Sequence, residues 1–332
     1  MNRQVVLATA SYGIPQAHNF QIVEQAVPEL ASDEILVQNY FLSVEPAMRG
    51  WLSDKGNYSK PIRIGDVMRS IAVGRVAASR CDQYPVGTIV TGWFGWQEMA
   101  VVAPTDVIRV VKEVDLPISL SLGVLGLNGM AAYLGLSLVG MPVAGDTVVV
   151  STAAGGVGSI VGQVAKLLGC RTVGITGSEV KVRACRDLYK YDEAFDYSLP
   201  ALAHRVAEAC PNGVNVYFDN TAGAISDAVR ANLAIGARIV VCGTASVSSW
   251  DPPPASSRVE RDLLTKRARM QGFLAFDHRE RYESTVEKLA AWVREGKLVW
   301  QEDVLEGLEA CPDAIAGLYR GENLGKRVIR LR

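Results

Sequence analysis

The sequence is poor in the residues that disulfide scaffolds and metal centres require. It holds six cysteines and three histidines in 332 residues, and no two cysteines form a C-x-x-C pair. This spacing argues against a disulfide framework and against a structural zinc site. The first hundred residues contain only His18 and Cys81 as soft ligands, and no Gly-His-Glu triplet occurs. A catalytic zinc would lack its ligands there, so we expect no functional metal.

The chain also lacks an excess of charge of either sign. Thirty-four basic and 35 acidic residues leave a net charge of −1, which argues against a nucleic-acid or anionic-membrane partner. Residues 1–15 show no signal-peptide pattern, so we expect a cytoplasmic location. Residues 116–145 carry no charge, but their six glycines and two prolines favour a buried helix and a loop over a membrane span.

Apolar residues are abundant and are arranged in two different patterns. Hydrophobic residues make up 49% of the chain, and a length of 332 residues at roughly 150 residues per domain predicts two domains. In the first hundred residues, short apolar runs alternate with Gly, Pro and Asp breaks. This pattern predicts a mostly antiparallel β domain, with strands at 35–40, 73–78, 89–93 and 98–102.

After Pro142 the pattern changes to strands that alternate with helices. We expect strands at 147–151, 171–176, 194–197, 214–219 and 238–242, separated by helices at 158–168, 180–188, 199–210 and 225–233. Such alternation predicts a doubly wound parallel sheet with helices on both faces. A Ser- and Pro-rich loop at 246–257 is a candidate lid or binding loop. A strand at 270–276, a helix at 279–295 and a last helix–strand unit follow.

The run from Val148 to Gly158 carries the clearest motif. Read against G-x-G-x-x-G it supplies Ala153, Gly155 and Gly158, between a predicted strand and a predicted helix. Gly155 lets the backbone approach a pyrophosphate, and Gly158 permits close packing of the helix on the strand. The helix N-terminus then faces the phosphates. This context favours dinucleotide binding over a tight turn with no ligand.

The end of the second strand of this unit indicates which dinucleotide binds. NAD sites usually place an acidic residue there, but residues 174–178 contain none, and Lys181 follows shortly after Glu179. A missing acid and a nearby cation suit the 2′-phosphate of NADP. The alternative is a solvated lysine in the first turn of a helix, where a cation opposes the helix dipole.

Along nearly its whole length the chain resembles the zinc-independent medium-chain dehydrogenase/reductases. It is most similar to the group of prostaglandin, curcumin and plant alkenal double-bond reductases. The markers lie, in chain order, at residues 42–49, 122–126, 153–158, 217–220, 266–273 and 323–326. The resemblance implies an α/β fold with a Rossmann domain at 121–304. A mostly antiparallel, GroES-like catalytic β domain at 1–120 and 305–332 completes it.

The resemblance also implies an activity and a set of site residues. The expected reaction is the NADPH-dependent reduction of the C=C bond of α,β-unsaturated ketones and aldehydes, by hydride transfer to the β-carbon and protonation of the enolate. The pyrophosphate is expected at Gly155, Gly156, Val157 and Gly158, and the 2′-phosphate at Lys181 and Tyr197. The nicotinamide half is expected at Asn220, Cys242, Gly243, Thr244, Ser248, Phe273, Leu274 and Asn323. Met48, Trp96 and Met130 are candidates for the substrate pocket, with ordinary core packing as the alternative.

Three positions depart from the pattern of these reductases. Ala47 replaces a common tyrosine, and Ser248 stands where relatives commonly carry the tyrosine proposed to guide or protonate the enolate. The proton donor is therefore unassigned. Ala222 replaces the first residue of a usual Gly-Gly pair, a change that we expect to matter less. Smaller residues at two pocket positions predict a roomier site and a bulkier substrate.

Two other functions remain open at this point. A quinone oxidoreductase shares the scaffold and the cofactor but delivers electrons to a quinone, and the markers at 42–49 and 266–273 favour the ene-reductase over it. A catalytically silent NADPH-binding protein is the second alternative, supported by the missing tyrosine. We expect a small-molecule enone as substrate, a homodimer, and no nucleic-acid or membrane partner.

Overall fold

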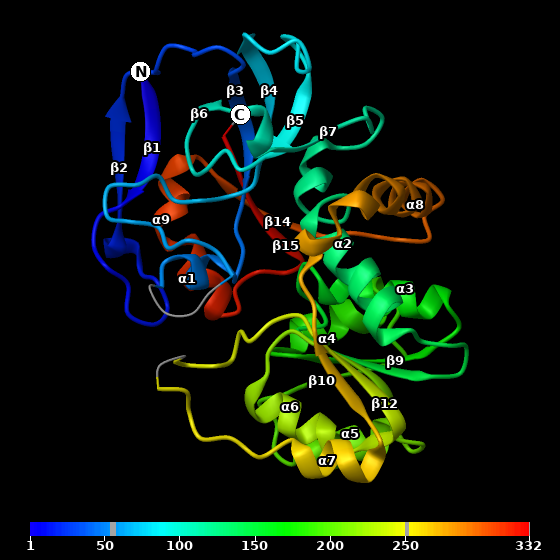
Figure 1. Ribbon diagram of the computed structural model, residues 1–332. Helices are drawn as coiled ribbons and strands as arrows, with labels where there is room; N and C mark the ends of the chain where they lie inside the picture. The colour runs from blue at the N-terminus through cyan, green and yellow to red at the C-terminus, as the bar shows by residue number, and fades with distance from the viewer. Residues whose placement is uncertain (54–57, 250–251, 332) are drawn as a thin grey trace. The chain divides into compact units, whose positions relative to one another are not determined.

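The chain forms two compact units that differ in secondary structure. The computed structural model describes residues 1–53, 58–249 and 252–331. One unit, the β unit, comprises Met1–Gly123 and Glu302–Arg332, and the other, the α/β unit, comprises Val124–Gln301. In Figure 1 the β unit runs from blue to cyan and returns in red, whereas the α/β unit runs from green to orange.

The β unit is built on a seven-stranded sheet with the order β14-β15-β3-β4-β5-β7, in which β6 also pairs with β3. Its strand pairs are antiparallel except β14 with β15, and β1 and β2 form a separate antiparallel pair. The strands are β1 (Asn2–Leu7), β2 (Phe20–Gln25), β3 (Ile35–Ser43), β4 (Ala72–Ser79), β5 (Ile89–Gly92), β6 (Met99–Val102), β7 (Val107–Val110), β14 (Glu302–Glu306) and β15 (Lys326–Arg330). The helices are α1 (Met48–Trp51) and α9 (Cys311–Tyr319).

Some strands of the β unit have no clear pattern in the sequence. The expected strands correspond to β3, β4, β5 and β6, but β1, β2, β7 and β14 were not predicted. Strand β14 shows the reason, because it reads Glu-Asp-Val-Leu-Glu and lies at the edge of its sheet without a buried residue. An edge strand in contact with solvent needs no apolar run, so its sequence resembles that of a loop.

The α/β unit contains a six-stranded parallel sheet with the order β10-β9-β8-β11-β12-β13. Successive strands extend outward in both directions from the neighbours β8 and β11, so the sheet is doubly wound, and the predicted fold class is confirmed. The strands are β8 (Thr147–Ser151), β9 (Arg171–Thr176), β10 (Glu193–Asp196), β11 (Val214–Asp219), β12 (Leu233–Val241) and β13 (Arg269–Gly272). The helices are α2 (Leu127–Leu134), α3 (Gly158–Leu167), α4 (Glu179–Arg183), α5 (Leu202–Ala209), α6 (Gly223–Arg230), α7 (Glu260–Lys266) and α8 (Tyr282–Arg294).

Helices cover both faces of this sheet, as its apolar strands require. On one face, Val149, Tyr217 and Ile239 pack with apolar residues of α5 and α6. On the other face, a Cβ at Gly140 would lie within 3.5 Å of Val216 and Val240, so the segment after α2 lies close to the strands. All five residues of β8 are buried, which places this strand at the centre of the unit.

Several predicted elements end elsewhere in the structure. The strand predicted at 270–276 stops at Gly272 and continues as a 3₁₀ helix, Ala275–Arg281. The helix predicted at 225–233 ends at Arg230, and Leu233 already begins β12. Because Leu233 is apolar and falls in helical register, the pattern alone could not mark this boundary. The uncharged residues 116–145 form short helices, and no helix in the described ranges is long and apolar enough to cross a membrane.

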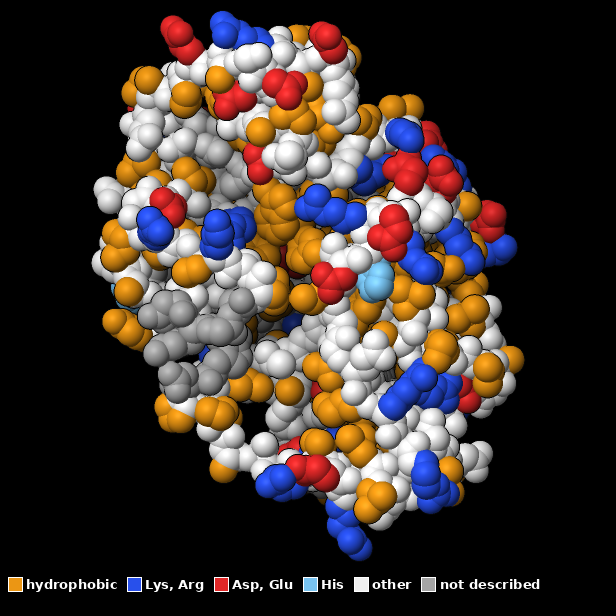
Figure 2. Space-filling view, viewed as in Figure 1, with side chains coloured by type: hydrophobic (Ala, Val, Ile, Leu, Met, Phe, Trp, Pro, Cys, Tyr) orange, Lys and Arg blue, Asp and Glu red, His pale blue; other side chains and the backbone are white. Residues whose placement is uncertain are grey.

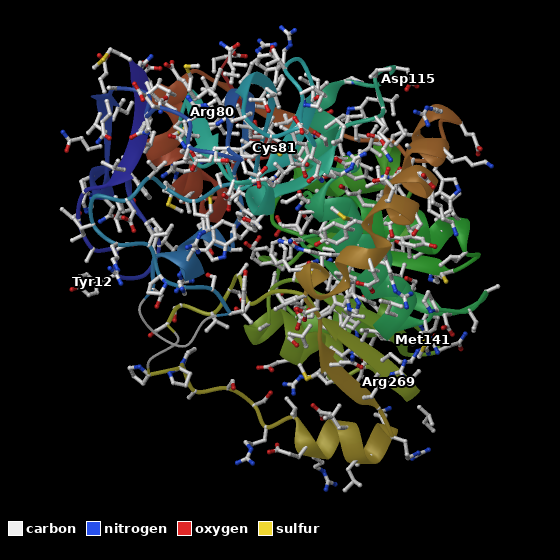
Figure 3. All side chains as sticks on the ribbon, turned by 45° about the horizontal axis from the view of Figure 1, so that its top comes forward. Tyr12, Arg80, Cys81, Asp115, Met141 and Arg269 are labelled. Atoms are coloured by element: carbon white, nitrogen blue, oxygen red, sulfur yellow. The ribbon has the colours of Figure 1, made fainter. Side chains whose placement is uncertain are left out.

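Two arginines hold the end of the helical segment that follows α2. A π-helical stretch, Gly135–Gly140, ends at Met141 in the left-handed conformation (φ 42°). Arg269 donates to Val139 O at 2.9 Å, and Arg238 donates to the carbonyl oxygens of Gly140 and Met141 at 2.9 Å each. These bonds satisfy carbonyl groups that a helix end leaves without partners. Figure 3 shows Met141 and Arg269 at the same end of the α/β unit.

Glycine allows α3 to approach β8 and β9 closely. A Cβ at Gly158 would collide with Thr152 O and lie 2.8 Å from Ala153 Cα. One turn later, a Cβ at Gly162 would overlap the ring of Tyr191. The Tyr191 side chain is completely buried, and its hydroxyl donates to Gly158 O at 2.7 Å. Tyr191 therefore holds the first two turns of α3 in place.

We predict that Gly162→Ala lowers the free energy of unfolding by about 2–4 kcal/mol, because overpacking displaces the Tyr191 ring and breaks its hydrogen bond. Urea denaturation followed by circular dichroism measures this change. Gly272→Ala is the matched control, because nothing lies within 4 Å of a Cβ at Gly272. The control is expected to change stability by less than about 0.5 kcal/mol. A Gly162→Ala protein of wild-type stability would contradict the role assigned to Tyr191.

Candidate functional site

The glycine-rich turn between β8 and α3 forms the centre of the candidate site. Ser151 ends β8, Thr152 takes a left-handed conformation (φ 49°), and α3 begins at Gly158. Gly155 N donates to Thr152 O at 2.8 Å, which closes the turn. Residues 155–157 are half-buried, and Ser159 N and Ile160 N donate to Gly155 O and Val157 O at 3.0 and 3.1 Å. The N–H groups of Gly156, Val157 and Gly158 have no backbone acceptor among the described residues. The turn therefore offers backbone donors of the kind that bind phosphate groups.

The end of the second strand, β9, lies next to the predicted 2′-phosphate residues. Ser178 caps α4 and accepts a hydrogen bond from Lys181 N at 3.4 Å. Tyr197 follows β10, and a Cβ at Gly177 would lie 2.9 Å from its ring, so the ring packs against the end of β9. The Tyr197 side chain remains 46% exposed, which leaves one side of the ring accessible. The structure brings Tyr197 to the strand end that precedes Lys181.

Asn220 connects the ends of two central strands. Its backbone N–H donates to Ser151 Oγ at 2.8 Å and its Nδ2 donates to Ser151 O at 2.7 Å. A Cβ at Gly243 would lie 2.8 Å from Asn220 O, so the residues after β12 pass directly beside it. The structure therefore brings Asn220 together with Cys242 and Gly243 at the point where the strand order reverses. Ligands of doubly wound sheets bind at this position.

Phe273 and Leu274 follow β13 at the same edge of the sheet. Phe273 N donates to Val241 O at 3.0 Å, which places the buried Phe273 beside the end of β12. Its ring stacks on His278 with centroids 5.3 Å apart. Leu274 is half-buried. Thr244 is exposed and accepts a hydrogen bond from Val247 N at 3.1 Å.

The predicted binding loop at 246–257 begins next to Asn220. Ser246 Oγ donates to the carbonyl oxygens of Thr221 and Ala222 at 2.8 and 3.0 Å. Ser248 is exposed, two residues further along. Trp250 and Asp251 lie outside the described residues.

The candidates for a substrate pocket are deeply buried. Met48 and Trp96, in the β unit, have 0% relative exposure, and Met130, in α2, has 2%. Trp96 Nε1 donates to Ser43 O at 3.1 Å, so its polar group already has a partner. Asn323, also in the β unit, is half-buried and donates to Gly325 O at 2.9 Å. Contact of these four residues with a ligand remains a prediction.

Asp219 lies within the sequence marker at residues 217–220 but was not predicted as a site residue. Its side chain is fully buried at the end of β11, and its Oδ1 accepts hydrogen bonds from Thr221 N and Ala222 N at 2.9 and 2.8 Å. Burial, and secondarily the charge of Asp219, raise the pKa of the Cys242 thiol to about 12. Cys242 is therefore a thiol and not a nucleophilic thiolate near neutral pH. Its place in this marker and at the end of a predicted central strand are the sequence signals that could have pointed to Asp219.

Comparisons with known proteins cover nearly the whole chain. Residues 3–110 match the family described as "N-terminal domain of oxidoreductase", and residues 156–291 match "Zinc-binding dehydrogenase". The NADPH-dependent curcumin reductase of Escherichia coli is 38% identical over 99% of this chain and 97% of its own. The NADP⁺-dependent 2-alkenal reductase of Nicotiana tabacum is 36% identical over the same shares.

The chain belongs to the medium-chain dehydrogenase/reductase family. Prostaglandin reductase 1 of Sus scrofa, 36% identical over 96% of this chain and 95% of its own, belongs to the same group of relatives. The resemblance predicted from the sequence motifs is thereby confirmed. The described residues contain no group of three or more His, Cys, Asp or Glu able to hold a metal ion.

Solved structures of family members agree with this assignment. The crystal structure of CurA from Vibrio vulnificus has a TM-score of 0.93 at 38% identity, covering 100% of this chain and 99% of its own. CurA in complex with NADPH has a TM-score of 0.91 at 37% identity, with 99% of each chain covered. A quinone oxidoreductase from Pseudomonas syringae, at 18% identity and a TM-score of 0.81, shares the fold.

A buried ion pair in the β unit holds the segment that leads to Met48. Lys326, the first residue of β15, donates through Nζ to Ser43 Oγ, Val44 O and Glu45 Oε1 at 2.7, 2.9 and 2.6 Å. Burial lowers the pKa of Lys326, and the neighbouring Glu45 opposes this effect. The lysine thereby joins the C-terminal strand to the end of β3.

We predict that Lys326→Met lowers the free energy of unfolding by about 3–5 kcal/mol, because it removes the cation from a buried pair. Lys326→Met/Glu45→Gln is expected to regain part of this loss, since the buried charge disappears with its partner. Denaturant unfolding of both variants tests this. Arg330→Met on the same strand is the control: its pair with Glu306 is about half exposed, and its loss should cost at most about 1 kcal/mol. Equal effects of Lys326→Met and Arg330→Met would contradict the prediction.

Proposed function

We propose that this chain reduces the C=C bond of α,β-unsaturated ketones and aldehydes with NADPH. The observation that carries the proposal is the β8–α3 turn, in which a side chain at Gly158 would collide with Thr152 O. Such close packing of the helix on the strand is the role of the third glycine in a dinucleotide-binding turn. The relatives named as curcumin, alkenal and prostaglandin reductases, together with the NADPH complex of CurA, support the same cofactor and reaction class.

In this proposal the residues of the α/β unit hold successive parts of the cofactor. Gly155, Gly156, Val157 and Gly158 bind the pyrophosphate through backbone N–H groups and the N-terminus of α3. Lys181 and Tyr197 bind the 2′-phosphate end, where β9 has no acid at its tip. The nicotinamide half lies against Asn220, Cys242, Gly243, Thr244, Phe273 and Leu274, whose positions converge at the edge where the strand order reverses. No metal takes part in this proposal.

NADPH supplies the hydride for the β-carbon of the enone, and a proton reaches the α-carbon. The protein's contribution is to orient the substrate and to stabilise the developing enolate oxygen with hydrogen-bond donors. Ser248 is exposed on the loop whose start Ser246 anchors, and a serine hydroxyl can donate to an enolate or hold a water.

The proposal is tested by NADPH oxidation against a panel of enones and quinones, with the product mass measured. An ene-reductase gives a saturated ketone two mass units above the enone. Reduction of quinones alone would favour the quinone oxidoreductase. NADPH binding without turnover on any of these compounds would favour a silent cofactor-binding protein.

We predict that Lys181→Ala raises KM for NADPH about ten- to a hundredfold, because a charge-assisted contact to phosphate is worth roughly 1.5–3 kcal/mol. KM for NADH is expected to stay nearly unchanged, since NADH lacks the 2′-phosphate. Steady-state kinetics with both cofactors measures the difference. Arg183→Ala, at an exposed position in the same helix, is the control. Equal effects on the two cofactors would show that Lys181 acts through stability.

We predict that Ser248→Ala lowers turnover by less than about tenfold, the range of one neutral hydrogen bond. An essential general acid would instead contribute about 10²–10⁴ in rate. Ser248→Tyr is expected to fold but to penalise bulky enones more than small ones, because the larger side chain narrows the pocket. Turnover on one small and one bulky enone measures both effects. A loss above about a hundredfold in Ser248→Ala, with NADPH binding intact, would identify the serine or its water as the proton route.

We also propose a cytoplasmic homodimer with no nucleic-acid or membrane partner. Basic and acidic side chains are interspersed on the face in Figure 2, without a large area of one sign. Strand β13 is the outer strand of its sheet, and three of its four residues are exposed. An open strand edge of this kind can pair with a second copy. Sedimentation tests the dimer, because the monomer mass is 35.8 kDa.

A further inference from the structure

Asp219 is a buried carboxylate held by neutral donors. It has 0% relative exposure, and within the described part of the chain its Oδ2 has no hydrogen-bond partner. Its Oδ1 accepts from Thr221 N and Ala222 N, from the hydroxyl of Tyr217 at 2.9 Å, and more weakly from the hydroxyls of Thr221 and Ser151 at 3.3 and 3.4 Å. Burying a carboxylate is costly unless it is well bonded. The cost of burying the Asp219 carboxylate indicates that this residue has a role other than core packing.

Asp219 also joins three strands of the sheet. Ser151 ends β8, Asp219 ends β11, and the backbone oxygen of Asp219 accepts from Cys242 N and Gly243 N at 2.8 and 3.1 Å, directly after β12. Asn220, the next residue, is bonded to Ser151 through both its backbone and its side chain. Asp219 therefore holds together the ends of β8, β11 and β12, where the nicotinamide is proposed to bind.

The Asp219 carboxylate holds a strained turn. Ala222 has φ 57° and ψ −158°, a backbone conformation found almost exclusively in glycine. Its N–H donates to Asp219 Oδ1 at 2.8 Å, and its carbonyl oxygen accepts from Ser246 Oγ at 3.0 Å. Strain of this kind persists only where the surroundings impose it. The hydrogen bonds of Ala222 with Asp219 and Ser246 impose this conformation.

The turn at residues 221–222 in its turn holds the start of the loop that carries Ser248. Ser246 donates through N and Oγ to Thr221 O at 3.0 and 2.8 Å, and Ala245 N donates to Asn220 O at 3.3 Å. A Cβ at Gly223 would lie 2.6 Å from Ser246 Oγ, so the contact leaves no free space. Movement of the turn would therefore move Ser246 and the loop behind it.

We infer that Asp219 is a positioning residue: its carboxylate imposes the strained turn at Ala222 and, through Ser246, sets the loop of Ser248 and the amide of Asn220 for hydride transfer. Asp219 is buried and touches neither cofactor nor substrate, so it acts through these residues. Its kinetic effect rests on the proposed function, whereas its effect on the turn does not.

The test compares Asp219→Asn with Asp219→Asn/Ala222→Gly. The amide is a weaker acceptor than the carboxylate, so the turn is expected to relax and the single-turnover rate of enone reduction to fall by ten- to a hundredfold. The Kd for NADPH should change by less than threefold, because the pyrophosphate and 2′-phosphate contacts remain. Glycine at 222 adopts the turn without strain, so the double variant should regain most of the rate. A purely structural role for Asp219 gives no such rescue.

Hydrogen exchange provides a readout that needs no activity. In Asp219→Asn, the amides of residues 221–222 and 246 are expected to exchange at least tenfold faster, and those of β8 at the wild-type rate. Asp106→Asn is the matched control, because Asp106 also accepts from a backbone N–H at a turn, Ala103 N at 3.2 Å, but lies in the β unit. Asp106→Asn should change neither the single-turnover rate of enone reduction nor the hydrogen exchange of the amides of residues 221–222 and 246.

The outcomes separate the two proposals. Wild-type exchange at 221–222 and 246 in Asp219→Asn overturns the inference, and so does a loss of rate that Ala222→Gly fails to rescue. If Asp219→Asn does not fold, Ser246→Ala tests the same connection and should lower the single-turnover rate at least threefold with Kd for NADPH unchanged. An unchanged single-turnover rate in Ser246→Ala also overturns the inference. A wild-type protein that reduces no enone contradicts the proposed function, while the exchange result still decides on Asp219.

Discussion

The close approach of α3 to the central strands is the constraint on which the candidate site depends. Side chains are excluded at Gly158 by Thr152 O and at Gly162 by the ring of Tyr191. Because the helix lies so close, its N-terminus and the turn before it present backbone N–H groups at the edge of the sheet. The Tyr191 hydroxyl donates to Gly158 O and so holds the first turn of α3 in this position. The proposed pyrophosphate site is thus a product of packing, and residues 152–158 contain no charged side chain.

A buried charge fixes strand ends in each of the two units. Asp219 joins three strand ends of the α/β unit, and Lys326 joins β15 to the end of β3 in the β unit. Each charge is buried, and each is surrounded by several hydrogen-bonding groups. A buried charge contributes little net stability but strongly disfavours alternative arrangements of its partners. Asp219 lies beside Asn220, and Lys326 lies beside the segment that leads to Met48, both of which are predicted site residues.

The sequence predicts regular, buried elements well and strained or exposed ones poorly. Strands β9 and β11 have the predicted bounds because apolar, β-branched runs end at clear breaks. The acidic edge strand β14 gave no apolar signal, and the boundary at Leu233 was hidden in a helical pattern. The replacement at Ala222 was expected to matter little, since φ cannot be read from composition, yet it lies in a conformation that favours glycine. The roles of Tyr191 and Asp219 depend on contacts between residues distant along the chain, which no local pattern reveals.

The central claim is that hydride passes from NADPH to the β-carbon of an enone and that the α-carbon takes its proton from solvent or a group in exchange with it. The most direct test uses NADPH carrying deuterium on one face of C4, with the position of the label in the product read by NMR. We expect deuterium at the β-carbon from one of the two labelled cofactors only, and deuterium at the α-carbon when the reaction with unlabelled NADPH runs in D₂O. Label at the carbonyl carbon, or a reduced product that carries no label from either of the two labelled cofactors, would contradict the account.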